Sequence, residues 1–217
     1  MNESSARNGF FSLNAGALLV AISAATVLTA CAPLLLGGAM VGGTLMVIDR
    51  RSSGAQVEDQ AIELKAGQRI REATGERGHV NVTSYNRMVL LTGEIASDAD
   101  RSAAEQAAAR VDNVRSLVNE LAVMGNSSLT ARSSDAIISG RVKAAFIDAK
   151  DLQANALKVV TERGATYLMG RVSEREAGRA TEVAREITGV QKVVRVFELI
   201  SEQELADLQK KAAPASK

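Results

Sequence analysis

The chain of 217 residues has very little of several residue types on which common protein sites depend. Its only cysteine, Cys31, has no second thiol with which to form an internal disulfide. Its only histidine, His79, leaves almost no material for a histidine-based acid–base pair or a histidine-rich metal site, so we expect a structural role for it. No serine or carboxylate lies in a GxSxG elbow, a Walker loop or a GxGxxG loop. The sequence therefore predicts a protein that is not an enzyme and that binds no metal, cofactor or small-molecule substrate.

The charge of the chain is nearly balanced, with a formal net charge of +1 at pH 7. Aromatic residues make up only 3% of it. Proteins that bind nucleic acid in bulk carry a strong excess of basic residues that meets the phosphates. We therefore expect no nucleic-acid partner.

An apolar run over residues 15–27 is followed by the sequence Leu-Thr-Ala-Cys at residues 28–31. This arrangement resembles the lipobox at which bacterial lipoprotein signal peptidase cleaves before the cysteine. The resemblance predicts a signal peptide over residues 1–30 and acyl chains, palmitate among them, on Cys31. Each buried methylene of such chains contributes about 0.8 kcal/mol to membrane binding. The alternative is that Cys31 is a small buried residue of a membrane helix.

The residue after the cysteine is Ala32, whereas Asp at this place tends to retain lipoproteins of this kind in the inner membrane. The resemblance therefore predicts the outer membrane, with the protein on its periplasmic face. Residues 32–48 form a second apolar stretch, which ends before Arg50 and Arg51. It is either a short spanning helix with both arginines in the cytoplasm or part of a flexible tether over residues 31–56. Four glycines, each of which weakens a helix by about 1 kcal/mol relative to alanine, favour the tether.

The rest of the chain contains two copies of one unit, since residues 90–97 align with residues 167–174. In each copy, alternating apolar residues indicate a strand hairpin, and an alanine-rich helix and a closing strand follow it. A further helix precedes each hairpin, over residues 57–71 and 135–147. We therefore expect an α+β fold of two αββαβ units, each with a small three-stranded mixed sheet packed on two helices.

The predicted domains follow from these copies: 57–124 for the first, 125–133 for a serine-rich linker, 134–201 for the second and 202–217 for a mobile C-terminal tail. Ser134 or Asp135 is expected to cap the first helix of the second copy. Gly93 and Gly170 are expected to be structural turn residues, at which each hairpin ends and the chain bends toward a helix.

Specific motifs within the copies carry a family resemblance. Leu-Thr-Gly-Glu-Ile at residues 91–95, the alanine-rich helix and Val-x-x-Val-x-x-Leu-Val-Asn at residues 111–119 together resemble a BON domain. The second copy, with Leu-Met-Gly-Arg-Val-Ser-Glu at residues 168–174 and Gly-Val-x-x-Val at residues 189–193, matches it still better. Two such copies behind a lipobox resemble the dual BON-domain outer-membrane lipoproteins. The resemblance implies a protein of envelope maintenance whose BON folds bind phospholipid surfaces.

Charge and helical spacing indicate which copy meets a lipid headgroup. Residues 58–123 have a net charge of −3 and residues 135–200 a net charge of +2, so only the second copy leans basic. Helical spacing places four residues of its first helix on a flank away from the inward side: Ile137, Gly140, Arg141 and Ala144. An apolar tip beside a guanidinium suits the headgroup region of a membrane, and Lys143 adds to the positive charge.

We therefore predict that this flank binds the surface of an anionic phospholipid membrane. The alternative is that Ile137 packs against the first copy and that Arg141 is a solvated surface charge. Two other functions remain open: an adaptor that docks on an outer-membrane protein or on outer-membrane assembly proteins, and a structural spacer without a ligand.

Overall fold

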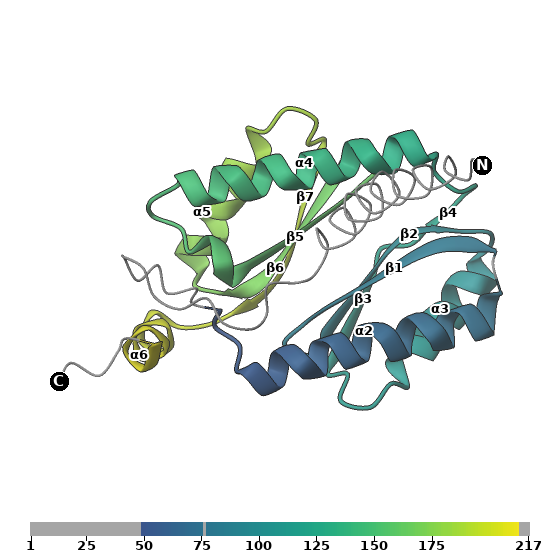
Figure 1. Ribbon diagram of the computed structural model, residues 1–217, viewed down its shortest axis with the longest axis horizontal. Helices are drawn as coiled ribbons and strands as arrows, with labels where there is room; N and C mark the ends of the chain where they lie inside the picture. The colour runs from purple at the N-terminus through teal and green to yellow at the C-terminus, as the bar shows by residue number, and fades with distance from the viewer. Residues whose placement is uncertain (1–48, 76, 213–217) are drawn as a thin grey trace, which may run out of the picture. The chain divides into compact units, whose positions relative to one another are not determined.

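The computed structural model describes residues 49–75 and 77–212, which lie within one compact unit. They form two successive α/β repeats, the first coloured blue to teal and the second green to yellow in Figure 1. The predicted α+β fold of two tandem units is confirmed. Cys31, the predicted signal peptide and residues 32–48 lie outside the described residues.

The first repeat has two helices and a mixed sheet. Strand β1 pairs antiparallel with β2, and both β3 and β4 pair parallel with β2. Its elements in chain order are α2 (Ser53–Thr74), β1 (Gly78–Tyr85), β2 (Met88–Ile95), α3 (Asp98–Ala109), β3 (Ser116–Asn119) and β4 (Ala122–Val123). The single closing strand that we predicted is thus broken in two, because Asn119 Oδ1 accepts a hydrogen bond from the Leu121 amide while the Leu121 side chain enters the core.

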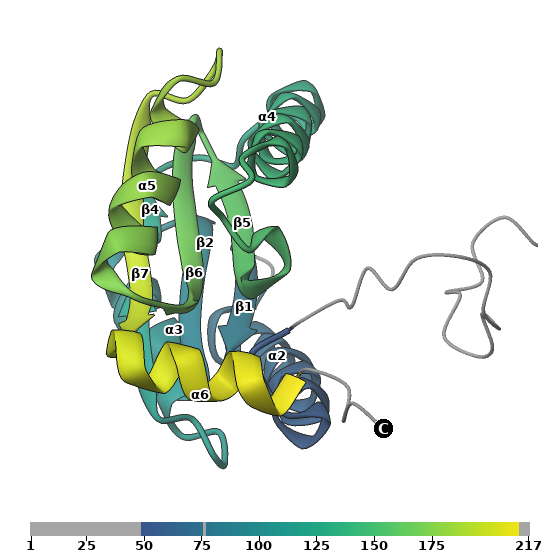
Figure 2. The same ribbon diagram turned by 90° about the vertical axis from the view of Figure 1, so that its left-hand side faces the viewer.

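The second repeat has the same order with an unbroken closing strand. Figure 2 shows its three strands side by side, with β6 in the middle, antiparallel to β5 and parallel to β7. Its elements are α4 (Leu129–Asp148), the 3-10 helix η1 (Ala154–Ala156), β5 (Leu157–Glu162), β6 (Ala165–Val172), α5 (Glu174–Arg185) and β7 (Lys192–Leu199).

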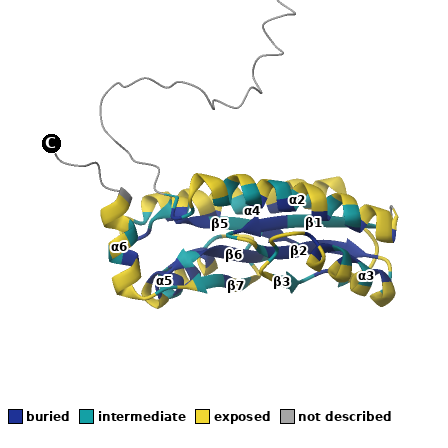
Figure 3. Cartoon of the chain, turned by 90° about the horizontal axis from the view of Figure 1, so that it is seen from below, coloured by how far each residue is buried: buried dark blue, intermediate teal, exposed yellow. Residues whose placement is uncertain are grey.

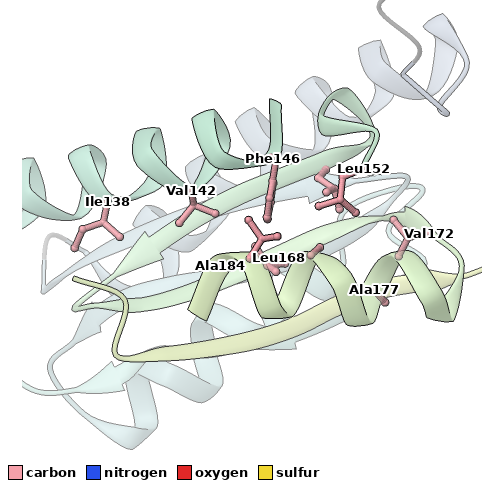
Figure 4. Packing of buried hydrophobic residues seen from close by; sticks show 11 residues of the cluster. Ile138, Val142, Phe146, Leu152, Leu168, Val172, Ala177 and Ala184 are labelled. Carbon is pink, nitrogen blue, oxygen red and sulfur yellow. The ribbon is translucent and has the colours of Figure 1, made fainter. Parts of the chain in front are cut away.

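Each repeat buries an apolar core between its helices and one face of its sheet. In the second repeat, Val142 and Phe146 of α4 meet Leu168 of β6 and Ala184 of α5, all fully buried (Figure 4). Small alanine side chains on α5 let this helix approach the sheet closely. Figure 3 shows the result, with buried residues along the strands and exposed residues along the outer sides of the helices.

A buried aspartate of the first helix holds the hairpin turn in both repeats. Asp59 accepts backbone hydrogen bonds of 2.7 and 2.8 Å from residues 86–87, and Asp135 accepts bonds of 2.8 and 2.9 Å from residues 163–164. All four turn residues have positive φ, the geometry of a type I′ turn. The same device at the same place supports the reading of the chain as a duplicated unit.

The other faces of the two sheets share a third apolar cluster. It is made by Tyr85 and Leu90 of the first repeat with Tyr167, Met169 and Val196 of the second. The Tyr85 hydroxyl donates a 3.2 Å hydrogen bond to the carbonyl oxygen of Ala156 across this interface. Polar contacts at its margins join the repeats further: Lys158 to Glu63, Asn86 to Glu198 and Arg163 to Glu94.

The predicted tether ends earlier than residue 56, because its last arginines contact the folded repeats. The Arg50 guanidinium is buried and forms two hydrogen bonds of 2.7 and 2.8 Å with Glu176 of the second repeat. Arg51 binds Asp59 of the first repeat at 2.8 Å and lies over the Tyr85 ring, 4.3 Å from its centroid. Two consecutive arginines before α2 thus contact both repeats, Arg50 the second and Arg51 the first.

Helix starts also differ from the predicted ones. The Ser128 hydroxyl caps α4 by accepting a hydrogen bond from the Ala131 amide, so this helix begins inside the predicted linker 125–133 and not at Ser134 or Asp135. Asp135 lies within the helix and points inward to the hairpin turn. Its tertiary role explains why it does not serve as the cap.

The C-terminal segment differs from the mobile tail predicted over residues 202–217. Helix α6 (Glu202–Ala212) occupies its described part, and Figure 2 shows it as a regular yellow helix. Leu205 is only 3% exposed, and Glu204 forms a 2.6 Å ion pair with Arg171. Burial of one leucine and this ion pair hold α6 against the second repeat.

Gly93 and Gly170 are not turn residues, because each lies inside a strand, two positions before its end. What they provide is close approach of neighbouring backbone, from β1 at Gly93 and from the end of η1 at Gly170. A Cβ on Gly170 would lie 2.5 Å from the carbonyl oxygen of Ala156, and a Cβ on Gly93 would overlap the carbonyl oxygen of His79. Gly93 also has φ of 110°, which side chains rarely adopt.

Candidate membrane-binding surface on the second repeat

Helix α4 is fixed in its rotation by the residues that it buries. Ile138, Val142 and Phe146, spaced by four, enter the core of the second repeat, and Asp135 reaches the hairpin turn from the same side. These four side chains leave the opposite side of α4 to solvent. The side of this helix that the sequence predicted to face the core is therefore the side that does so.

All five residues predicted to bind phospholipid lie on this exposed side. Ile137 is 56% exposed, and Gly140, Arg141, Lys143 and Ala144 are exposed as well. A Cβ on Gly140 would meet no atom within 4 Å, so the surface is open there. Ile137 is therefore not buried against the first repeat, whereas the other half of that alternative, a solvated Arg141, agrees with the exposure of this residue.

One further apolar residue extends the stripe beyond the predicted set. Ile147 lies ten positions after Ile137, which is close to three helical turns, and it is 66% exposed. The prediction ended the helix at Ile147 and so assigned no outward role to that residue. Its spacing from Ile137 was the signal that sequence reasoning missed. We call Ile137, Gly140, Arg141, Ala144 and Ile147 the α4 stripe.

The cations beside the α4 stripe, two on α4 and one just after its end, form no ion pairs within the described chain. Arg141, Lys143 and Lys150 take part in none of the salt bridges among residues 49–75 and 77–212. By contrast, Arg179 and Arg195 of the same repeat each bind a carboxylate within 3.0 Å. The cations beside the α4 stripe are therefore available to an external anion.

The equivalent helix of the first repeat has a different outer side. The buried Asp59 and Asp135 occupy matching positions, which places Leu64 of α2 at the position of Gly140. Leu64 is 76% exposed, but α2 carries one more acidic than basic residue, whereas α4 carries one more basic than acidic. Only α4 combines exposed apolar side chains with a positive balance.

Within the described residues, one group has the side-chain types of a metal site: His79, Glu94 and Glu162. It lies between the repeats and not on the α4 stripe. No helix in the part of the chain that the structure describes is both long and apolar enough to cross a bilayer.

Comparison with known proteins assigns the fold to a family. The BON domain model matches residues 58–125 and 134–200, one match for each repeat. The outer membrane lipoprotein DolP of Haemophilus influenzae is 31% identical over 186 residues, which cover 84% of this chain and 95% of that protein. A 21 kDa hemolysin of Actinobacillus pleuropneumoniae is 30% identical over 155 residues, or 70% of this chain and 80% of that protein.

A solved structure of CdsD, a structural protein of the type III secretion system of Chlamydia trachomatis, covers 71% of this chain and 97% of its own at 12% identity. Its TM-score of 0.27 is too low for any conclusion. The match to DolP over nearly its whole length supports an association of this chain with the outer membrane. The chain belongs to the BON family and is a dual BON-domain protein that resembles DolP.

Proposed function

We propose that this chain is a non-enzymatic, lipid-anchored protein on the periplasmic face of the outer membrane, where its second BON domain binds anionic phospholipid and supports the integrity of that membrane. The anchor is Cys31, and the binding surface is the α4 stripe with Lys143. The observation that carries the proposal is the combination on one helix of two exposed isoleucines with two cations, Arg141 and Lys143, that form no ion pair within the described residues.

Physical chemistry gives each part of this surface a role. The apolar side chains of Ile137 and Ile147 would enter the boundary between headgroups and acyl chains. The guanidinium of Arg141 would meet a phosphate in a bidentate manner, and each cation near an anionic surface contributes about 1 kcal/mol. Because Gly140 has no side chain, the backbone of α4 could lie close to the membrane surface there.

Binding through α4 can be tested on the full anchored chain by photo-crosslinking. A photoreactive amino acid at residue 140 is compared with the same amino acid at residue 64, its matched position on α2. Both proteins are reconstituted in vesicles that contain phosphatidylglycerol or only phosphatidylcholine. We expect lipid adducts at residue 140 with phosphatidylglycerol, few with phosphatidylcholine and few at residue 64 with either.

Charge and apolar contributions can then be separated. Arg141→Glu and Ile137→Glu should each reduce the adduct at residue 140, whereas Leu64→Glu should leave it unchanged. Equal adducts at residues 140 and 64, or no effect of Arg141→Glu, would show that α4 does not recognise anionic lipid and that the protein meets the membrane elsewhere.

A second function is favoured by one feature of the first repeat. Val123 and Met124, at the short strand β4, are 41% and 50% exposed. Among the described strands, β4 pairs with β2 alone, so its other edge offers a site for an adaptor contact with an outer-membrane protein. A photoreactive residue at position 124 in living cells should then capture one defined outer-membrane protein that residue 64 does not capture.

A further inference from the structure

Three side chains with metal-ligating atoms meet where the two repeats face each other. His79 of β1 and Glu94 of β2 are cross-strand neighbours in the first repeat, and Glu162 comes from the end of β5 in the second. One ligand atom from each residue lies within 4.8 Å of the other two. The group thus contains one imidazole nitrogen and two carboxylates, contributed by both repeats.

The imidazole of His79 has a buried nitrogen without a hydrogen bond. Its Nδ1 atom is shielded from solvent and has no partner in the described chain. It lies 3.6 Å from Glu94 Oε2, which is too long for a good hydrogen bond. Ligands at about 2.0–2.1 Å from a tetrahedral zinc ion lie about 3.3 Å from one another. The His79–Glu94 pair would need to close by only a few tenths of an ångström, while Glu162, whose ligand atom lies within 4.8 Å of the other two, would need to approach further.

The two carboxylates carry more negative charge than the nearby cations balance. Both are buried, with Glu94 0% and Glu162 3% exposed. Arg163 binds Glu94 Oε1 at 3.0 Å, while Glu162 Oε2 accepts a 2.9 Å hydrogen bond from the uncharged amide of Asn81. Burial, together with the negative charge of Glu94 and that of nearby Asp135, raises the pKa of Glu162.

We infer that His79, Glu94 and Glu162 form a binding site for a divalent transition-metal cation of the zinc type, with water as the fourth ligand. Imidazole and carboxylate together suit such an ion. Glu94 Oε2 also accepts two 3.0 Å hydrogen bonds, one from the Ser127 amide and one from the Ser127 hydroxyl. When the metal binds to Glu94, the hydroxyl would rotate away and the amide would keep its bond.

A metal at this place would connect the two repeats. The apolar cluster and the ion pairs already hold the sheets together, and one ion adds a bond from β1 and β2 to the end of β5. The sequence predicted no metal site because a single histidine cannot form a histidine-rich one. A mixed site needs only one histidine, and it needs a fold that brings residues 79 and 162 together. The inference is independent of lipid binding by α4.

The test uses the full chain in mild detergent, without a histidine tag and after treatment with a chelator. Titration with Co²⁺ should give the visible absorption bands of a tetrahedral site, and Zn²⁺ should displace Co²⁺ at one ion per chain. Loss of a hydrogen-bonded neighbour of a metal ligand typically weakens binding about 10–100-fold, so loss of a ligand should weaken it at least as much. We therefore expect His79→Gln and Glu162→Gln each to bind Zn²⁺ at least about 10-fold more weakly.

Two controls separate this site from other sources of binding. Glu63→Gln removes a carboxylate at the same interface, where it binds Lys158, and should leave metal affinity unchanged. Cys31→Ser removes the only thiol and should also leave it unchanged. No saturable Co²⁺ or Zn²⁺ binding, equal binding by His79→Gln with native circular dichroism, or loss of binding in Cys31→Ser would overturn the inference.

Discussion

Replacing Arg50 by Gln removes the only guanidinium that is hydrogen-bonded to Glu176 in the described chain, and it should destabilise the protein strongly. The two side chains are 2% and 6% exposed and meet through two hydrogen bonds, while Arg50 also donates to the Arg171 carbonyl at 2.7 Å. Breaking a buried ion pair by removing one partner costs about 3–5 kcal/mol, since it leaves the other charge unpaired. Glu176 keeps a 3.1 Å bond from the Ser173 amide, so we expect about 3 kcal/mol.

The effect should depend on pH in a defined direction. Burial alone raises the pKa of Glu176, but hydrogen bonds from Arg50 and from the Ser173 backbone outweigh it and hold this pKa below its ordinary value. A lowered folded-state pKa stabilises the fold above the unfolded pKa of about 4, and the contribution disappears as pH falls through the folded value. Without Arg50, burial dominates and Glu176 protonates more easily. The difference between the native chain and Arg50→Gln should therefore shrink as the pH falls from 7 to below 4.

Urea unfolding of the full chain in mild detergent, followed by far-ultraviolet circular dichroism, measures this difference. The matched control is Arg101→Gln, which removes an exposed ion pair with Asp98 and should cost no more than about 0.5 kcal/mol. Glu176→Gln in the Arg50→Gln background should add little, since the charge left unpaired is then gone. A cost for Arg50→Gln below about 1 kcal/mol, or one that does not vary with pH, would refute the reasoning.

Three further changes test the backbone and the interface between repeats by the same assay. Gly93→Ala should cost more than about 2 kcal/mol, because it combines an unfavourable φ with an overlap against the His79 carbonyl; a cost below about 0.5 kcal/mol would argue against close approach. Arg87→Gly should stabilise by about 0.5 kcal/mol, since Arg87 has φ of 67°, and destabilisation would contradict this. Glu162→Gln, measured with a chelator present, should stabilise the protein near neutral pH, because the raised pKa of Glu162 means that its charged form destabilises the folded state. This gain in stability should vanish below the pKa of the unfolded chain, where the carboxyl is neutral in both states.

The order of helices and strands could be predicted because each has a clear period. Alternating residues such as Val80 and Val82 defined the hairpin, and four-residue spacing from Ile138 to Val142 to Phe146 fixed which side of α4 is buried. Once the buried side of a helix is known, its exposed side follows. This is why all five predicted residues of α4 lie at the surface.

Long-range pairing could not be predicted, because a local pattern contains no partner. Arg50 and Glu176 are 126 positions apart, and two arginines after an apolar stretch are equally compatible with a membrane flank. The start of α4 was missed for a related reason. Ser128 and Ser134 can each cap a helix, and the choice depends on Asp135, which must point inward to bind the hairpin turn.

The two repeats show where a difference in function between them must reside. Their inner sides have the same structural role, since Asp59 and Asp135 both hold a hairpin turn and the residues after them fill the core. Such positions cannot distinguish one copy from the other. The outer sides are free of these demands, and there Leu64 of α2 is replaced by Gly140 of α4, beside Arg141. A comparison of matched outer positions therefore separates recognition of a ligand from maintenance of the fold, which a substitution in either core would confuse.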